Sequence, residues 1–319
     1  MEADGKYFPA THSAQTVLDA LLHKVRRAGV EMITGRNVTA LSFRDNLFFA
    51  QGDDFLAKAR TALVATGGLS HPNTGSDGAG YGFAKQFGHR IVFTTPALTP
   101  FTVADGALKK LAGLSVPGRV TLRVNGKKQA SFEGACLFTH VGLSGPAMLN
   151  MSRHWLRAEP ADSRELRLNA LPGMDADAFR KRLLEAAARN PERTIKACVS
   201  EHLPERFAET LLRKVDLDPG ARLHRLRAEE RERLIRTLFD FPLDVRGVVG
   251  YGKAEATAGG VDLAEVDHRT LESKKRPGLF FAGEVLDVDG RIGGFNFQWA
   301  WSSGYAAGQG AACCARAGR

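Results

Sequence analysis

The stretch from Gly278 to Gln298 constrains the fold of this chain more than any other part of its sequence. Leu279 to Ala282 is an apolar run as short as a buried strand, and Gly283 and the acid Glu284 follow it directly. After a loop, Gly293-Gly294 leads into a predicted helix over residues 296–308. This arrangement suits a polar, electron-rich ligand, because an acid accepts a hydroxyl and the N–H groups of a helix start face negative charge.

We interpret this stretch as a flavin seat. The competing interpretation is an ordinary strand-to-helix connection whose glycines only permit its turn. These residues by themselves favour neither interpretation.

The bulk properties describe a globular protein of two or three domains. The chain has 319 residues, of which 44% are hydrophobic, and it has no run of 18 apolar residues. Its first six residues are polar where a signal peptide would be apolar, so we expect a cytoplasmic protein without a membrane partner. The four cysteines have neither zinc nor redox spacing, so no metal site is expected.

The net charge of +9 raises the question of a nucleic-acid partner. Between Arg180 and Asp240 there are 15 Lys/Arg against 11 Asp/Glu, with both signs interspersed. Such mixing is typical of solvated helical faces, and no aromatic-rich basic motif accompanies it. Composition therefore disfavours nucleic acid, and a positive field would equally suit an anionic cofactor.

The first ninety residues predict pieces of a nucleotide-binding fold. Val17 to Val25 has helical spacing closed by Gly29, and Val30 to Ile33 should form a strand. Residues 37–43 and 47–50 predict a β-meander, and residues 62–65 predict a buried strand that ends at Thr66-Gly67-Gly68. Residues 72–80 form a glycine-rich loop before a helix over 81–87, so a second helix start lies behind glycines.

From Arg90 the pattern changes to short β segments. The Asn125-Gly126 pair after residues 120–124 is a strong hairpin signal, so we expect an antiparallel sheet or small barrel. Ser144 lies between glycines but lacks the spacing of a hydrolase nucleophile, and residues 140–146 more plausibly start a helix. Residues 175–240 predict helices with breaks at prolines.

Four motifs in one order carry a family resemblance. They are Ala65 to Gly75, Leu137 to Pro146, Thr257 to Val261, and Ala282 to Asp287 together with Gly293 to Asn296. In these the chain resembles the BaiN/YhiN-type flavoproteins, a group of NAD(P)/FAD-dependent oxidoreductases with aminoacetone-oxidase-like members, over essentially its whole length.

The resemblance implies an α/β fold in which a split Rossmann-like FAD-binding domain carries a β-barrel-like insertion and a helical insertion. The FAD-binding domain would comprise residues 1–92 and 275–319. The β-rich insertion would comprise residues 93–172 and 242–274, and the helical one residues 173–241.

The same resemblance implies FAD as cofactor and NAD(P)H as electron donor. The implied cofactor-binding residues are Val38, Thr66, Gly67, Gly68, Thr74, Gly75, Gly283, Glu284, Asp289, Gly293, Gly294, Phe295 and Asn296. Val38 would lie by the adenine, Glu284 by the ribityl or phosphate region, and Gly293 to Asn296 at the flavin pyrimidine edge. A helix start there would stabilise the negative charge of a reduced flavin.

One departure from the family pattern is large. The family begins with a strand and a Gly-x-Gly-x-x-Gly phosphate turn, and the sequence contains no such fingerprint. The chain is therefore expected to be truncated at its N-terminus, with apolar strand edges unpaired. Losing pyrophosphate contacts worth about 1.5–3 kcal/mol each would weaken FAD binding by orders of magnitude, so we expect this chain alone to be poorly soluble or flavin-free.

The candidate catalytic residues are His140 and His71, which flank glycine loops, with Asn296 and Gln298 as further substrate-side groups. A histidine exchanges protons near neutral pH, although in such loops it more often serves a structural hydrogen bond.

Three function classes follow. The first is a flavin-dependent oxidoreductase that transfers a hydride or electrons through FAD to or from a small organic substrate. The second is a flavin-lacking remnant that binds a ligand or partner, and the third is a basic nucleic-acid-associated protein. The sequence does not determine the substrate, the direction of the reaction or the oligomeric state.

Overall fold

The apolar run after Gly278 forms a buried strand, β14 (Leu279–Phe281), which pairs in parallel with β4 (Ala62–Val64). This computed structural model describes residues 5–159 and 163–317. They divide into two compact units. Unit 1 contains the chain up to Gly67, Gly78–Val92 and the chain from Gly260 on, and unit 2 contains Gly68–Asp77 and Phe93–Gly259. The chain passes between the units through β5 (Ile91–Ala97) and β13 (Ala256–Val261).

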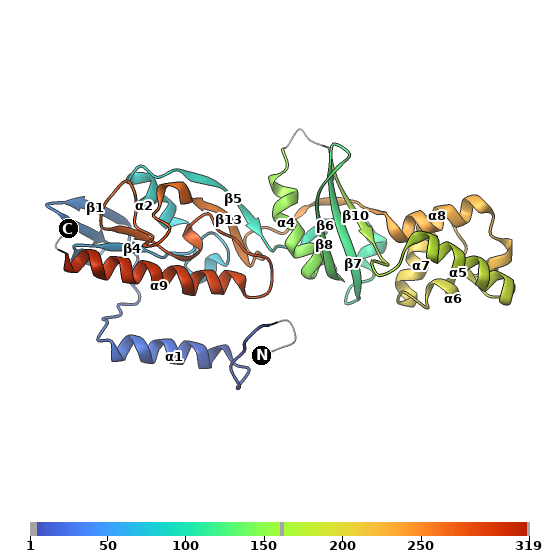
Figure 1. Ribbon diagram of the computed structural model, residues 1–319, viewed down its shortest axis with the longest axis horizontal. Helices are drawn as coiled ribbons and strands as arrows, with labels where there is room; N and C mark the ends of the chain where they lie inside the picture. Colours follow the sequence, from blue (N-terminus) through green and yellow to red (C-terminus); the bar gives the residue numbers. More distant parts are fainter. Residues whose placement is uncertain (1–4, 160–162, 318–319) are drawn as a thin grey trace. The chain divides into compact units, whose positions relative to one another are not determined.

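Unit 1 is built around the β4–β14 pair. Helix α9 (Phe295–Arg316) packs along both strands (Figure 1), and α2 (Ala79–Gln86) follows β4 in the unit. An antiparallel meander adds β1 (Ala40–Arg44), β2 (Leu47–Gln51) and β3 (Leu56–Ala59). The predicted meander, both strands of the pair and the two helices are therefore confirmed, while β3 went unpredicted.

The strand predicted at Val30 to Ile33 is wrong. The segment has no strand pairing in the structure, and Val30, Met32 and Ile33 are 57%, 55% and 61% exposed. The preceding helix α1 (Ala14–Arg27) has the predicted spacing but buries none of its residues. A strand forms only where a neighbour completes its hydrogen bonds, and the described chain offers none to this segment.

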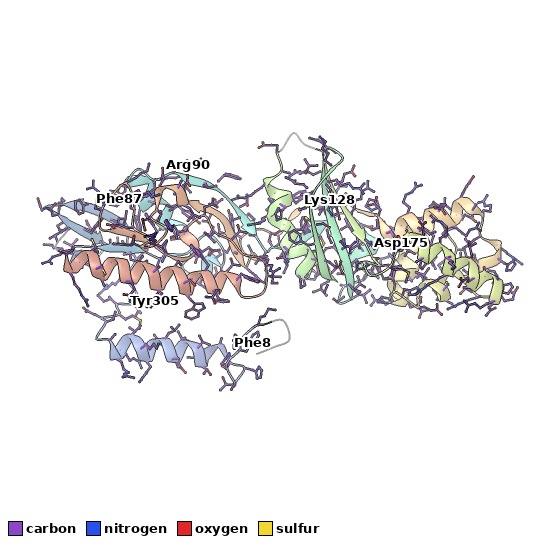
Figure 2. All side chains as sticks on the ribbon, viewed as in Figure 1. Phe8, Phe87, Arg90, Lys128, Asp175 and Tyr305 are labelled. Carbon is purple, nitrogen blue, oxygen red and sulfur yellow. The ribbon has the colours of Figure 1, made fainter. Side chains whose placement is uncertain are left out.

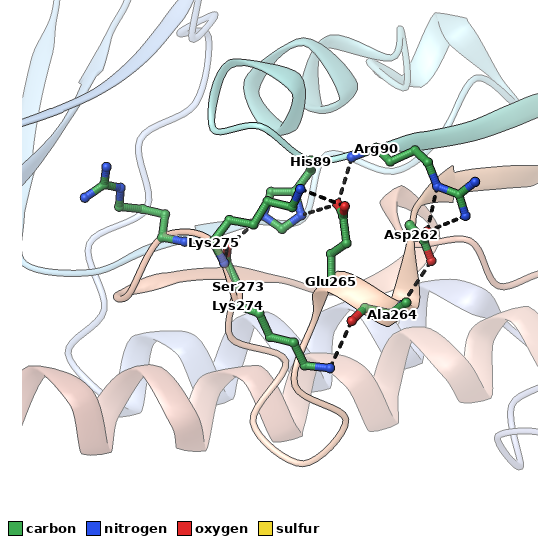
Figure 3. A network of polar contacts seen from close by, with 9 residues as sticks. His89, Arg90, Asp262, Ala264, Glu265, Ser273, Lys274 and Lys275 are labelled. Atoms are coloured by element: carbon green, nitrogen blue, oxygen red, sulfur yellow. Dashed lines mark hydrogen bonds and ion pairs between the residues drawn. The ribbon is translucent and has the colours of Figure 1, made fainter.

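A polar network holds the start of β5 against η3 (Leu263–Glu265) in unit 1 (Figure 3). The buried ring of His89 places Nε2 2.7 Å from Ser273 Oγ and Nδ1 3.3 Å from Glu265 Oε2. Lys275 Nζ lies 2.8 Å from the other oxygen of Glu265. Burial lowers the pKa of His89 below its ordinary 6.5, although the charge of Glu265 opposes this effect.

Unit 2 contains an antiparallel sheet with the strand order β11-β10-β7-β8-β9-β6-β12. The strands are β6 (Phe101–Val103), β7 (Ser115–Val124), β8 (Lys127–Phe138), β9 (Gly142–Ser144), β10 (Arg164–Asn169), β11 (Phe241–Leu243) and β12 (Val245–Val248). The Asn125-Gly126 hairpin is confirmed, since both residues have positive φ, of 51° and 76°, between β7 and β8. The end strands β11 and β12 have no mutual pairing in the described chain, so the sheet is open rather than a closed barrel.

Helices complete unit 2. They are α3 (Gly106–Lys109), α4 (Pro146–Arg157), α5 (Ala176–Arg189), α6 (Ile195–Val199), α7 (Glu205–Lys214) and α8 (Ala228–Phe239), with η1 (Pro72–Thr74) and η2 (Leu223–Arg225) as single turns. One hydrophobic core joins the sheet to the helices, where the rings of Phe138 and Phe207 lie 5.0 Å apart. In the part of the chain that the structure describes, no helix has the length and apolar character to cross a bilayer.

Candidate functional site

The end of β4 carries a buried hydroxyl that lacks a partner. Thr66 Oγ1 makes no hydrogen bond with any described residue, although a buried hydroxyl normally has one. Gly80 of α2 packs directly against it, because a Cβ at Gly80 would lie 2.1 Å from that oxygen. Glycine is therefore required where α2 approaches the strand end, and the unsatisfied hydroxyl marks a place for a polar ligand atom.

An apolar groove of about 260 Å³ runs along β4 and includes Thr66 in its lining. Val38 and Thr66, both predicted cofactor contacts, are thus brought to the same groove. The remaining lining residues are Leu41, Phe48, Ala50, Ala57, Ala59, Thr61, Ala62, Leu63, Val64 and Phe83. Small alanines and aliphatic side chains leave room for a flat, apolar ring system.

The turn after β14 presents the predicted acid. Gly283 has φ +74° and begins the single turn η4 (Gly283–Val285), in which Glu284 is half-buried. A left-handed φ favours glycine, which explains why the strand ends at this residue. The turn thereby places Glu284 at the carboxyl end of a parallel strand, where ligands of α/β sheets bind.

The start of α9 is the second polar element of unit 1. Gly293 and Gly294 have φ of 123° and 86°, and no side chain among the described residues caps the helix that begins at Phe295. The N–H groups of its first turn therefore remain for a ligand acceptor, with the positive end of a helix of 22 residues behind them. Asp289 lies half-buried in the preceding loop.

The Asn296 side chain holds the protein rather than open space. Its Oδ1 accepts the Gly290 N–H at 2.7 Å, and its Nδ2 donates to the Gly290 carbonyl at 3.3 Å. Phe295 stacks beneath Arg291, whose guanidinium carbon lies 4.6 Å from the ring centroid. These contacts fix the loop before α9, so the backbone N–H groups rather than the Asn296 amide remain for a cofactor.

The other predicted site residues lie in unit 2. Gly68 begins a loop that Thr257 anchors, since Thr257 Oγ1 accepts the N–H groups of Leu69 and Ser70 at 2.8 and 3.1 Å. His71 follows with a strained φ of 54°, and Thr74 Oγ1 donates to its carbonyl at 2.7 Å. Gly75 closes the same turn.

His140 lies on an exposed turn of unit 2. The turn is closed by Thr139, whose N–H donates to the Gly142 carbonyl at 2.8 Å and whose hydroxyl accepts the Gly142 N–H at 3.1 Å. The ring of His140 is thus presented to solvent on a rigid turn. No contact in the structure joins His140 to His71, so their shared catalytic role remains a prediction.

Three residues of this region were missed by sequence reasoning. Trp299 and Ser303 of α9 both bond to the backbone of Gly283, and Lys6 lies beside Gly293, where a Cβ would be 3.2 Å from Lys6 Cε. The i, i+4 spacing of Trp299 and Ser303 placed both on one helix face, which was the available signal. No sequence pattern linked Lys6 to Gly293.

The charge excess belongs mainly to unit 2. Its segments contain 27 Lys/Arg against 21 Asp/Glu, which is six of the net nine positive charges. Exposed Lys127 and Lys128 form the tip of the β7–β8 hairpin, as Lys128 shows in Figure 2. Unit 2 therefore offers a moderately positive surface to an anionic partner.

Comparisons with known proteins agree on one family. The HI0933-like protein Rossmann domain matches residues 1–310. The chain is 37% identical to a ribosomal RNA dihydrouridine synthase of Escherichia coli, over 93% of this chain and 72% of that protein. The corresponding enzyme of Haemophilus influenzae is 33% identical, over 92% and 71%. A 3-dehydro-bile acid delta(4,6)-reductase of Clostridium scindens is 31% identical, over 97% and 76%.

Proposed function

Because the chain belongs to the HI0933-like family of FAD-dependent flavoprotein oxidoreductases, we propose that it reduces a carbon–carbon double bond conjugated to a carbonyl group. We further propose that the substrate is a uracil base in RNA. The two kinds of relative support the shared chemistry. Dihydrouridine is uridine saturated at its C5–C6 bond, and a delta(4,6)-reductase of a 3-oxo steroid saturates bonds conjugated to the ketone.

RNA is favoured over a steroid by two observations. Two relatives are named for ribosomal RNA, and they are 37% and 33% identical to the chain, against 31% for the bile acid reductase. Unit 2 also carries most of the positive charge, which suits phosphates. Composition alone disfavoured nucleic acid, because a charge count does not reveal what the active site recognises.

The residues of unit 1 fit an FAD, and the orphaned Thr66 hydroxyl is the observation that supports this most directly. Val38 and Thr66 would hold it along the β4 groove, and Glu284 would bond a hydroxyl. The backbone of Gly293 to Phe295 would face the electron-rich end. When bound, FAD supplies the hydride.

We assign residues 1–92 and 275–319 to the cofactor domain, with Gly67, Gly68, Thr74 and Gly75 at its edge. Residues 93–172 and 242–274, together with the helical residues 173–241, would shape the substrate side as insertions. NAD(P)H is the proposed electron donor.

The chain must also supply a proton. Saturating a conjugated double bond adds a hydride at the β-carbon and a proton at the carbon next to the carbonyl. His140 is the proposed proton donor, because its turn is rigid and its ring is exposed to an incoming substrate. His71, on the loop held by Thr257, is the second candidate.

The test is a reduction assay with two substrate arms. The purified chain is incubated with FAD, NADPH and in-vitro-transcribed ribosomal RNA, and the RNA is digested to nucleosides for mass spectrometry. We expect dihydrouridine at discrete positions. FAD-dependent consumption of a 3-oxo-4,6-diene steroid with unmodified RNA would instead assign a small-molecule substrate, and the absence of FAD binding would overturn the cofactor proposal.

A further inference from the structure

Helix α9 holds the Gly283 turn by both of its peptide groups. The Gly283 N–H donates to Ser303 Oγ at 2.9 Å, and Trp299 Nε1 donates to the Gly283 carbonyl at 3.0 Å. The two peptide planes that flank Gly283 are therefore both anchored to one helix. Because these planes define φ and ψ of Gly283, α9 sets the direction in which η4 leaves the strand.

The Ser303 hydroxyl is fully committed to this task. It donates to the Trp299 carbonyl at 2.6 Å while accepting the Gly283 N–H, and the residue is 2% exposed. A buried hydroxyl with both roles filled has one orientation. Trp299 and Ser303 thus form a single rigid clamp, in which each depends on the other.

The clamp joins two parts of the candidate site. On one side is the β14 turn with Glu284, and on the other is α9, whose uncapped start lies one helical turn before Trp299. Strand β14 is itself fixed, because the Ala282 N–H donates to the Val64 carbonyl of β4 at 3.1 Å. The clamp is therefore what fixes the acid-bearing turn relative to the helix start.

We propose that Trp299 and Ser303 are positioning residues for the flavin, acting through Gly283 and Glu284 rather than by touching the cofactor. The inference rests on the proposed function. Without the clamp, Gly283 keeps only the Leu286 N–H at 3.2 Å within its own turn. Glycine then explores other conformations, and the site loses its preorganised acid.

The test uses Trp299→Phe, which keeps a ring and removes the N–H, and Ser303→Ala. Ser303→Thr is the rescue variant because it keeps the hydroxyl, and Ser302→Ala is the matched control on an exposed neighbour of α9. Hydrogen exchange of the amides of residues 283–285 is measured first, in the FAD-free chain. We expect about tenfold faster exchange there in Trp299→Phe and Ser303→Ala, with the β14 amides unchanged.

FAD affinity, measured by quenching of flavin fluorescence, is the second readout. We expect a rise in Kd of about tenfold in the same two variants and a return to the parent value in Ser303→Thr. Unchanged exchange and unchanged Kd in Trp299→Phe would overturn the inference. A parent chain that binds no FAD would refute the proposed function, while faster exchange in the variants would still establish the clamp and unchanged exchange would remove it.

Discussion

Thr66 and His89 show how single buried polar groups serve different ends. Thr66 keeps a hydroxyl without a partner at the end of β4, where an apolar side chain of the same shape would fit the folded chain better. His89 satisfies its ring through Ser273 and Glu265 and holds unit 1 together. The first is a site for a ligand and the second is a structural anchor.

We predict that Thr66→Val separates stability from cofactor binding. Removing an unsatisfied buried hydroxyl should leave the free energy of unfolding unchanged or raise it by about 1 kcal/mol, because its desolvation is no longer uncompensated. FAD affinity should fall by about tenfold as a hydrogen bond is lost. Urea denaturation and FAD titration measure the two effects.

The matched control is Thr61→Val, in the same groove. If Thr61→Val weakened FAD binding as much as Thr66→Val, the strand-end hydroxyl would have no special role.

The His89 network predicts a stability that falls with acid. Since burial lowers the pKa of His89, the unfolded chain binds a proton more readily, and stability is lost as the pH falls through the ordinary value of 6.5. Glu265 adds a loss below its ordinary 4.5, because Lys275 and the Arg90 N–H hold its pKa down despite burial. Urea denaturation between pH 8 and 5 should show His89→Gln to be less stable at pH 8 and less dependent on pH. His23→Gln, on the exposed α1, should keep the slope of the parent chain.

At the scale of elements, α9 owes its position to small residues. A Cβ at Gly310 would lie 2.7 Å from the Thr270 carbonyl and 2.9 Å from a ring carbon of Phe280, whereas a Cβ at Gly308 would meet nothing within 4 Å. The helix therefore approaches β14 closely through one of its glycines and not through the other.

Two substitutions in α9 should consequently have opposite signs. Gly308→Ala should stabilise the chain by about 0.5–1 kcal/mol through helix propensity alone. Gly310→Ala should destabilise it, because backbone at Thr270 must move to admit the methyl group. Thermal unfolding by circular dichroism compares the two, and a stabilising Gly310→Ala would show that α9 does not pack against β14 as described.

Helix α1 and the segment 30–33 are the elements that the fold holds least. No residue of α1 is buried, and β4 pairs with β14 alone in the described chain, which leaves its other edge beside the groove. The relatives named above are longer than this chain, which covers 71–76% of them.

Hydrogen exchange should therefore be fast in α1 and slow in α9. An isolated helix of 14 residues is marginal in water, so its amides should exchange at nearly the rate of an unfolded peptide. Protection of α1 comparable to that of α9 would mean that it packs on the chain in solution.

At the scale of the whole molecule, the two units have separate stabilising interiors. The large core of unit 2 joins its sheet to its helices, and unit 1 packs Phe280 and Phe281 beneath α9. Such an arrangement departs from two-state unfolding.

Calorimetry should show two transitions that respond to different substitutions. Leu211→Ala, in the core of unit 2, should lower one of them by the effect of about 2–5 kcal/mol expected for a buried leucine. Phe280→Leu should lower only the other, and added FAD should raise that same one. A single transition shifted by both substitutions would show that the units unfold together.

Local patterns in the sequence determined much of this protein. The run before Gly283 was long enough for one buried strand, Asn125-Gly126 could adopt only a tight hairpin, and the glycines before Phe295 marked a helix start. Each of these depends on a few neighbouring residues, so each could be read in order along the chain.

Only the tertiary structure decided which of these patterns acquired partners. Val30 to Ile33 has the composition of a strand but no neighbour to pair with, so it is not one. Thr66 was a predicted contact, but its unsatisfied hydroxyl becomes visible only when Gly80 packs against it. Trp299 and Ser303 gained their role because α9 returns to a turn that ends a different element. Hydrogen bonding and burial are properties of pairs, and the partners of these residues are set by the fold.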